Sequence, residues 1–343
     1  MKAMLLKEFG KPLAWEEVPE PRITGPRQVL VQAKTNGLCA TDLKIWDGLV
    51  KSAKKPLLLG HESAGVVLEA GGEVESVKPG DRVVMVAKQT CGRCRMCRAG
   101  REEMCLQSPG RMGFEIDGGF GELVAVSERN LVKVGSSVAM EAACLIGGTL
   151  GSPLHGIRMA RVEVGETAVV FGLGGLGIHA LQLLRHLGAN VIGVDVKDEK
   201  LEAARGLGAA HTINALQADP VKAVMDLTGG VGADVALEIV GGAAVPPVIA
   251  QCMELLRPGG RLLILGYHYG QTVPIDPAKM VYKWIQIIAS HNHSVRDVTD
   301  AASLVNDGRV KAVISGTAPM REANEALGSL RKGDPVGRLV LQW

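Results

Sequence analysis

The chain has 343 residues, of which 47% are hydrophobic and 22% charged, and its formal net charge at pH 7 is +2. This length predicts two domains with large cores, and the near-neutral charge gives no reason to expect nucleic acid or a membrane as a partner. The pattern of the first residues predicts no secretory signal, and no apolar run is long enough to predict a membrane span. We interpret the seven cysteines as thiols or metal ligands in a reducing compartment. We therefore expect a cytoplasmic protein.

The first 150 residues are predicted to be rich in short β-strands. Apolar runs at residues 29–31, 64–67 and 82–86 are separated by turns that contain glycine or proline. Strands this short and this regularly interrupted indicate a twisted barrel.

Two segments of this region carry residues that could bind a metal ion. Cys39 lies in the segment 37–44, and His61 and Glu62 lie in the segment 59–65. A thiolate, an imidazole and a carboxylate can together form an open zinc site. Taken singly, each residue is a weak indication, because a lone cysteine usually fills a core and a His-Glu pair usually lies in a solvated turn.

Four cysteines that lie close together in the segment 88–108 form a second candidate metal site. They are Cys91, Cys94, Cys97 and Cys105. Four thiolates can close a tetrahedron around Zn²⁺ and leave no position for water, which indicates a structural site. The alternative is a pair of disulfides or a redox-active Cys-x-x-Cys motif. We favour zinc because three evenly spaced cysteines cannot all pair locally.

The stretch 168–195 predicts a dinucleotide-binding strand, turn and helix. An apolar strand at 168–171 is followed by a glycine-rich turn and a helical pattern, and a second apolar strand at 191–194 ends in Asp195. In such a turn the first glycine allows the tight bend, the second lets the backbone approach a pyrophosphate, and the third packs helix on strand. The residues of this turn are Gly172, Gly174, Gly175, Leu176 and Gly177.

Asp195 indicates which dinucleotide binds. Its carboxylate could accept hydrogen bonds from an adenosine ribose diol and would repel a ribose 2′-phosphate, so we predict NAD over NADP. Glycine triplets also occur in ordinary tight turns, but here the strand, the helix, the second strand and the acid are all present. Residues 151 to about 290 continue to alternate strands with helices, which predicts a doubly wound parallel sheet.

These motifs, taken in order along the whole chain, resemble those of the zinc-containing medium-chain alcohol dehydrogenases. The matching features are Cys-x-Thr-Asp at 39–42, the Gly-His-Glu segment at 60–65, the turn at 77–83, the four-cysteine lobe, the glycine-rich turn, and Gly-Arg-Leu-Val near the end. The resemblance implies an α/β protein with a GroES-like β-rich catalytic domain and a Rossmann dinucleotide-binding domain. It also implies a homodimer or homotetramer, usually joined through the nucleotide domains.

The resemblance assigns the domain bounds and the roles of the site residues. The catalytic domain would comprise 1–150 and 291–343, with a structural zinc lobe at 88–108, and the dinucleotide-binding domain would comprise 151–290. Cys39 and His61 resemble catalytic zinc ligands, and Glu62 resembles a neighbouring carboxylate that can join or leave the metal. Thr41 resembles the hydroxyl that receives the alcohol proton, and Asp42 the carboxylate that orients His61.

Arg338 resembles a coenzyme phosphate contact, but two other positions depart from the family pattern. Gly148 stands where the family usually supplies a third zinc ligand. Either Glu62 becomes the third protein ligand, or the site holds zinc weakly, or it holds none. Lys44 stands where many members have a histidine that passes a proton to solvent. A lysine could relay a proton if its pKa were lowered, or it could be solvated and play no catalytic part.

The leading hypothesis is a zinc-dependent enzyme that transfers hydride between an alcohol and NAD. Small-alcohol members often carry a bulky aromatic residue where this chain has Ala87, which favours secondary or bulky alcohols. One alternative is a zinc-free medium-chain reductase of activated double bonds such as enoyl thioesters, which Gly148 favours and the three potential ligands oppose. Another is a nucleotide-binding protein without turnover, because a fold alone does not establish an activity.

Overall fold

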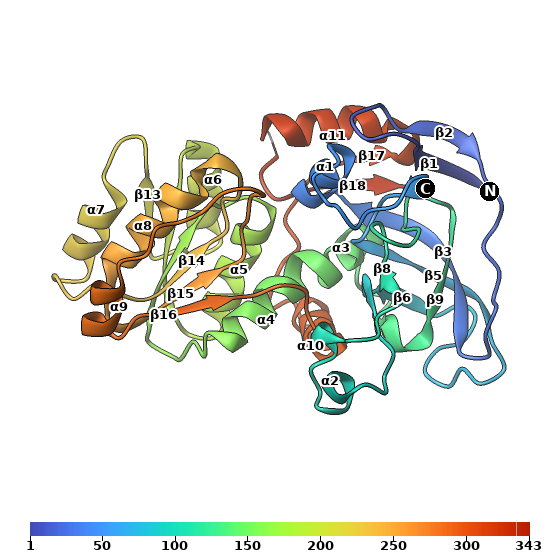
Figure 1. Cartoon of the computed structure of the whole chain (residues 1–343), viewed down its shortest axis with the longest axis horizontal. Helices are drawn as coiled ribbons and strands as arrows, with labels where there is room; N and C mark the ends of the chain where they lie inside the picture. The colour runs from blue at the N-terminus through green and yellow to red at the C-terminus, as the bar shows by residue number, and fades with distance from the viewer. Residues whose placement is uncertain (334) are drawn as a thin grey trace. The chain divides into compact units, whose positions relative to one another are not determined.

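A computed structural model of the chain describes residues 1–333 and 335–343. The chain divides into two compact units, one formed by Met1–Gly151 with Asn292–Trp343 and the other by Ser152–His291. Each unit has its own sheet (Figure 1). Among the described residues, no helix combines the length and the apolar character that crossing a membrane requires.

The first unit is built on a curved sheet of seven strands. Its order is β10-β6-β5-β3-β18-β17, with β9 also paired to β3. A second, three-stranded sheet has the order β2-β1-β4. The strands are β1 (Lys2–Leu6), β2 (Ala14–Glu17), β3 (Gln28–Gly37), β4 (Leu57–Leu58), β5 (Ser63–Ala70), β6 (Arg82–Met85), β9 (Leu123–Ser127), β10 (Leu131–Lys133), β17 (Ile314–Pro319) and β18 (Arg338–Gln342).

The predicted β-rich domain is confirmed, but hydrogen bonding does not close its sheet into a barrel. Along the described strands, β10 and β17 end the sheet and do not pair with each other. The reason lies in β3, because β9 pairs with its residues 28–32 and β18 with its residues 35–37, both along the same edge. The sheet therefore branches at β3. Burial alternates along β3, and its inward side chains Val29, Val31 and Ala33 belong to the core.

The last strand of the chain, β18, pairs with the carboxyl end of β3. Val340 of β18 lies opposite Gly37 of β3, and the backbone N–H of Leu38 donates to the carbonyl oxygen of Leu339 at 2.9 Å. This pairing places Arg338, the first residue of β18, beside the segment that begins at Leu38. The helices of the unit are α1 (Ala40–Trp46), α2 (Arg95–Arg98), α3 (Met140–Leu145), the π-helical turn η3 (Ile146–Leu150), α10 (Val295–Asn306) and α11 (Ala323–Lys332).

The second unit is a parallel six-stranded sheet with the order β13-β12-β11-β14-β15-β16. This is the order of a doubly wound dinucleotide-binding fold, and it confirms the predicted fold class. The strands are β11 (Thr167–Phe171), β12 (Asn190–Asp195), β13 (His211–Asn214), β14 (Ala233–Glu238), β15 (Leu256–Ile264) and β16 (Gln286–Ala289). The helices are α4 (Gly151–Met159), α5 (Gly175–His186), α6 (Asp198–Gly206), α7 (Pro220–Leu227), α8 (Val245–Leu255) and α9 (Pro277–Lys283).

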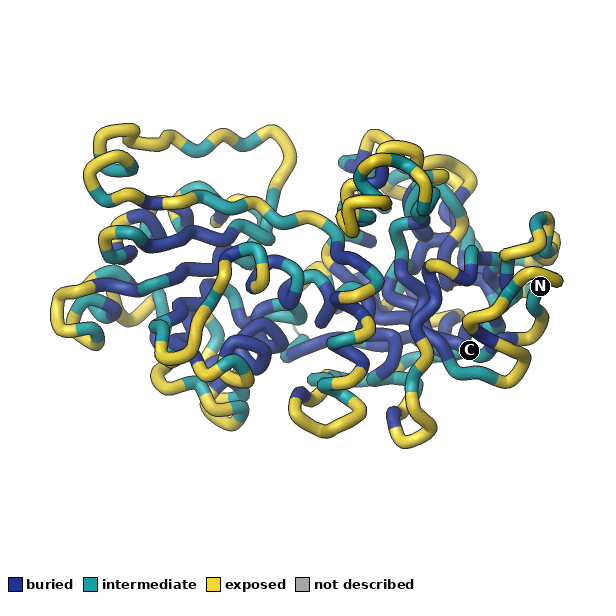
Figure 2. The backbone as a smooth tube through the Cα atoms, turned by 90° about the horizontal axis from the view of Figure 1, so that it is seen from below, coloured by how far each residue is buried: buried dark blue, intermediate teal, exposed yellow. Residues whose placement is uncertain are grey.

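Apart from Thr167, Asp234 and Glu238, the residues of the central strands β11 and β14 are apolar. Val169, Val170 and Phe171 of β11 are at most 2% exposed, as parallel strands covered on both faces require. Figure 2 shows this contrast along the backbone, with buried segments inside each unit and exposed segments at its surface. The glycine-rich turn follows the carboxyl end of β11, and Asp195 is the last residue of β12, so both are anchored to the buried sheet.

Candidate functional site

The first part of the candidate site forms where β3 ends and α1 begins. Cys39 precedes the first residue of α1, and its backbone N–H donates to Oδ2 of Asp42 at 2.8 Å. Asp42 is fully buried, and its second oxygen, Oδ1, lies 3.0 Å from Nδ1 of His61. A carboxylate that accepts from Nδ1–H fixes the tautomer and the orientation of the ring. The other ring nitrogen, Nε2, is thereby left available to a metal or a substrate.

Cys39, His61 and Glu62 come together as one group of potential metal ligands. The Cys39 sulfur, a ring nitrogen of His61 and a carboxylate oxygen of Glu62 lie within 4.8 Å of one another. Cys39 is 8% exposed and Glu62 is 1% exposed. A largely buried set of one sulfur, one nitrogen and one oxygen donor suits Zn²⁺, so the residues present fit this ion.

Electrostatics at this group favour the deprotonated state that a metal ligand needs at Cys39, but they favour the protonated ring at His61. Burial alone would raise the pKa of Cys39, but the charge of Arg338 and a hydrogen bond from His61 lower it below its ordinary value. Burial alone would lower the pKa of His61, but Asp42 and Cys39 raise it well above its ordinary value. The thiol therefore loses its proton readily, and a metal binding here would release the proton held on the imidazole.

Arg338 and Thr149 hold the carboxylate of Glu62. Nη2 of Arg338 donates to Oε1 of Glu62 at 3.0 Å, and the Thr149 hydroxyl donates to Oε2 at 2.7 Å. Nε of Arg338 donates to the Thr149 oxygen at 2.6 Å, and Nη2 lies 3.6 Å from the Cys39 sulfur. The contact of Arg338 with a coenzyme phosphate remains a prediction. Sequence reasoning missed Thr149, whose only signal was its place next to Gly148.

Thr41 and Lys44 lie on the first two turns of α1 and are half-buried. Their spacing of three residues places them on the same side of a helix. Their parts in proton transfer remain predictions.

The four lobe cysteines converge in the same unit. Cys91, Cys94, Cys97 and Cys105 place their sulfur atoms within 4.8 Å of one another, and none forms a disulfide. Backbone N–H groups, first that of Cys97, lower the pKa of Cys94 to about 6, whereas burial raises that of Cys97 to about 12. Four sulfur donors in one cluster fit a closed zinc site.

The glycine-rich turn has the steric properties that a dinucleotide requires. Gly172 has a φ of +91°, and a Cβ on Gly177 would lie 1.7 Å from the carbonyl oxygen of Gly172. A Cβ on Gly174 would meet nothing within 4 Å, so open space remains in front of the residue that begins α5. Strand and helix pack closely while one side of the turn stays free, which fits a pyrophosphate at the helix N-terminus.

Asp195 is held at the end of β12 by three backbone amides. Oδ2 accepts from the N–H of Leu173 at 2.7 Å, and Oδ1 accepts from Val196 at 2.8 Å and Lys197 at 3.1 Å. The carboxylate is 9% exposed and is fixed to the glycine-rich turn. Its hydrogen bonds to a ribose remain a prediction.

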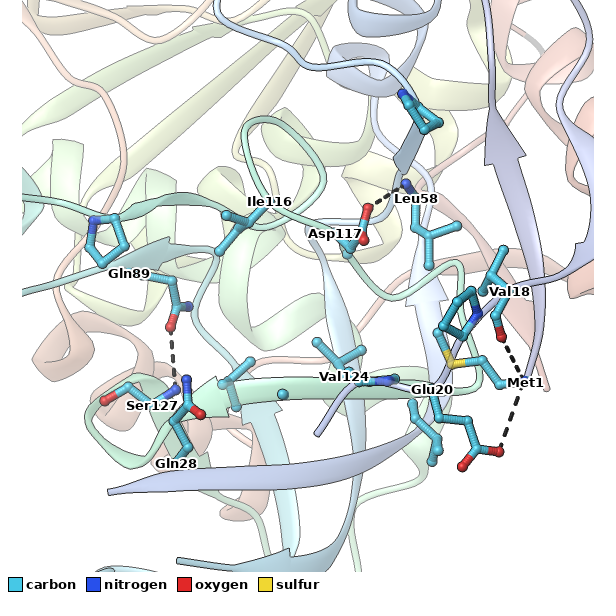
Figure 3. A pocket seen from close by; sticks show the side chains of 18 of the residues that line it. Met1, Val18, Glu20, Gln28, Leu58, Gln89, Ile116, Asp117, Val124 and Ser127 are labelled. Carbon is cyan, nitrogen blue, oxygen red and sulfur yellow. Dashed lines mark hydrogen bonds and ion pairs between the residues drawn. The ribbon is translucent and has the colours of Figure 1, made fainter. Parts of the chain in front are cut away.

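One cavity of the first unit lies away from these residues. It measures about 730 Å³ and is lined mainly by apolar side chains from the amino-terminal segment, β9 and the loop around Ile116 (Figure 3). Met1 lines this cavity, and its amino group donates to the carbonyl oxygen of Val18 and lies 3.9 Å from Glu20. None of the predicted site residues lines it. It is therefore not the substrate pocket expected from the metal ligands.

Comparison with known proteins links both units to described families. Residues 25–136 match the alcohol dehydrogenase GroES-like domain, and residues 175–333 match the zinc-binding dehydrogenase family. The NAD-dependent alcohol dehydrogenase of Sulfurisphaera tokodaii is 34% identical, over 99% of both chains. The L-threonine 3-dehydrogenase of Streptomyces avermitilis is 34% identical, over 100% of this chain and 99% of the relative. The crystal structure of the alcohol dehydrogenase from Aeropyrum pernix has a TM-score of 0.91 at 34% identity and covers 100% of both chains.

Proposed function

Because the chain belongs to the zinc-containing medium-chain alcohol dehydrogenase family, we propose that it oxidises a secondary or bulky alcohol to the ketone or aldehyde. It is an NAD-dependent oxidoreductase with zinc as its metal, and the reverse reduction uses NADH. The observation that carries the proposal is the largely buried group of Cys39, His61 and Glu62, whose donor atoms lie within 4.8 Å of one another.

In this proposal Cys39, His61 and Glu62 hold the catalytic zinc. When bound there, zinc acts as a Lewis acid that lowers the pKa of the substrate hydroxyl. Asp42 keeps Nε2 of His61 directed at the site through its bond to Nδ1. Thr41 receives the hydroxyl proton and passes it to the nicotinamide ribose. Lys44, on the next turn of α1, would relay the proton toward solvent only as the neutral amine.

The glycine-rich turn and Asp195 hold NAD in this proposal. The N–H groups at the start of α5 face the pyrophosphate, and Gly174 supplies the open space in front of them. Asp195 accepts hydrogen bonds from the ribose diol, and its three backbone partners keep it in place. A phosphate contact by Arg338 requires its guanidinium to keep one N–H free of Glu62 and Thr149.

Two observations support a secondary or bulky substrate. Ala87 leaves more room than the aromatic residue found in many small-alcohol members, and threonine, named as substrate of one relative, is oxidised at a secondary carbon. A panel of alcohols with NAD tests this proposal. We expect cyclic and branched secondary alcohols to give a higher kcat/KM than ethanol, and a preference for ethanol would contradict it.

The substitution Cys39→Ser tests the catalytic assignment. We expect it to abolish turnover and to leave NADH binding nearly intact, because Cys39 belongs to the first unit and the glycine-rich turn to the second. Elemental analysis should find about two zinc ions per wild-type chain, since the residues that the structure describes form two candidate sites. About one ion per chain would favour the zinc-free reductase, the alternative that Gly148 supports.

We also infer a cytoplasmic homodimer or homotetramer joined through the second unit. Strand β16 has a single neighbour in its sheet, so its other edge is open to pairing with a second copy. Tyr282 and Trp284, just before this strand, are 85% and 75% exposed. The seven cysteines are all free thiols, as a reducing compartment allows. Light scattering coupled to gel filtration measures the oligomer, and a monomer in both wild type and Trp284→Ser would contradict it.

A further inference from the structure

The carboxylate of Glu62 occupies the space that a side chain at position 148 would need. A Cβ built on Gly148 would lie 2.7 Å from both Cγ and Oε1 of Glu62. On the other side, a Cβ built on Gly37 would lie 2.7 Å from Oε2 of Glu62 and 2.7 Å from Leu145. Separations this short do not occur between a Cβ and its neighbours in folded proteins. The two glycines therefore form a cradle around the carboxylate.

Glu62 cannot turn away from Gly148 without losing its partners. The side chain is 1% exposed, and its oxygens are bonded to Arg338 at 3.0 Å and to Thr149 at 2.7 Å. Its backbone carbonyl also accepts from the N–H of Gly37 at 2.8 Å. A buried carboxylate moved off such bonds would leave charged groups unpaired, which is costly. The Glu62 carboxylate in this position and a side chain at position 148 therefore cannot be present together.

Thr149 gives the carboxylate its orientation. It is fully buried in η3, whose π-helical geometry widens the turn that carries Gly148. Nε of Arg338 can only donate, so the Thr149 oxygen accepts from it at 2.6 Å. The single hydroxyl proton of Thr149 is then left for Oε2 of Glu62. The direction of both hydrogen bonds follows from the chemistry of the donors.

We propose that Gly148 and Thr149 are positioning residues that make Glu62 the third protein ligand of the catalytic metal in this chain. Gly148 leaves the space that the carboxylate fills, and Thr149 directs the carboxylate toward Cys39 and His61. A catalytic zinc site has three protein ligands, and this group holds three residues that can ligate. The inference rests on the proposed function, because it requires the site to hold zinc.

The first test measures zinc retention and not activity. Full-length wild type, Thr149→Val and Thr149→Ser are dialysed against increasing concentrations of a chelator, and zinc per chain is followed by elemental analysis. We expect Thr149→Val to lose the zinc of the catalytic group at an about 10 to 100-fold lower chelator concentration than wild type, because Thr149 orients a ligand of that zinc. Thr149→Ser keeps the hydroxyl and should retain zinc like wild type. The same chelator resistance in Thr149→Val and wild type would contradict the role of Thr149.

The second test exchanges the ligand between the two positions. Gly148→Ala and Glu62→Ala should each leave one zinc per chain, held by the lobe. The double variant Gly148→Asp with Glu62→Ala should regain the second ion, because removal of the Glu62 side chain leaves space for the new carboxylate. Retention of the lobe zinc and an unchanged affinity for NADH show that a variant has folded.

The outcomes separate this inference from the proposed function. One zinc in the wild-type chain would overturn both. Two zinc ions in wild type, and undiminished retention in both Gly148→Ala and Thr149→Val, would overturn this inference alone and leave the proposed function standing.

Discussion

The two candidate metal sites of the first unit are assembled in opposite ways. The lobe takes its four ligands from one short stretch, Cys91 to Cys105. The catalytic group takes Cys39 and His61 from neighbouring segments, and Arg338 joins it from the other end of the chain through the pairing of β18 with β3. The geometry of the lobe should therefore depend mainly on its four ligands. The geometry of the catalytic group should depend also on residues that do not bind the metal.

Removing a lobe ligand should have the largest effect on stability. We expect Cys97→Ala to lose one zinc per chain and to lower the free energy of unfolding by on the order of 5 kcal/mol, because a structural zinc contributes its binding energy to folding. Zinc content and thermal melting measure this. Cys39→Ser is the matched comparison: it should also lose one zinc, yet keep its melting temperature within a few degrees. Equal destabilisation by both variants would remove the distinction between the two sites.

Removing the charge of Arg338, which is far from the ligands in sequence, tests how the catalytic group depends on tertiary structure. Arg338→Met leaves the buried carboxylate of Glu62 without its charge partner and should cost about 3 to 5 kcal/mol of unfolding free energy. Adding Glu62→Gln should recover much of that loss. Urea unfolding measures both, and Arg331→Met is the control, since its ion pair with Asp47 is largely exposed and should contribute under about 1 kcal/mol. A similar cost for the two arginines would argue against a special role for Arg338.

The pairing of Asp42 with His61 makes a smaller and more specific prediction. Asp42→Asn should weaken zinc binding at the catalytic group by about 10 to 100-fold, because an amide orients the imidazole less firmly than a carboxylate. The lobe zinc should be unaffected. Asp47→Asn, which alters an exposed residue at the end of α1, should change neither site. Competition with a chromogenic chelator provides the measurement, and equal affinities in wild type and Asp42→Asn would refute it.

A local ion pair beside the lobe should have the smallest effect, and only in acid. Although burial opposes it, bonds from Arg111 lower the pKa of Glu115 to about 2. Because the folded-state pKa lies below the unfolded one, this pair stabilises the protein above about pH 4.5, and the contribution disappears as the pH falls toward about 2. Glu115→Gln should therefore cost about 1 kcal/mol near neutral pH, because the pair is partly screened by solvent, and almost nothing near pH 2. Unfolding followed across this range tests it, with the exposed Glu202→Gln as a control that should leave the profile unchanged.

The difference between the two sites also explains which features could be predicted. The lobe cysteines and the glycine-rich turn are local patterns, so their spacing already indicates their geometry. The parallel sheet of the second unit was readable from alternating strands and helices, and it is confirmed. The expected barrel was only partly right, since nothing in the short strands of the first unit indicated that β9 and β18 would share one edge of β3.

By itself, the sequence determined the family, the use of NAD and zinc, and the absence of a side-chain ligand at Gly148. The family follows from the order of these motifs along the chain, and each motif consists of residue types at short spacing, whose chemistry does not depend on distant parts of the chain. Only the tertiary structure decided what fills the space at Gly148. It brings Glu62, Thr149 and Arg338 together from three distant segments. A buried carboxylate needs hydrogen-bond partners, and which residues supply them depends on how the strands and helices pack.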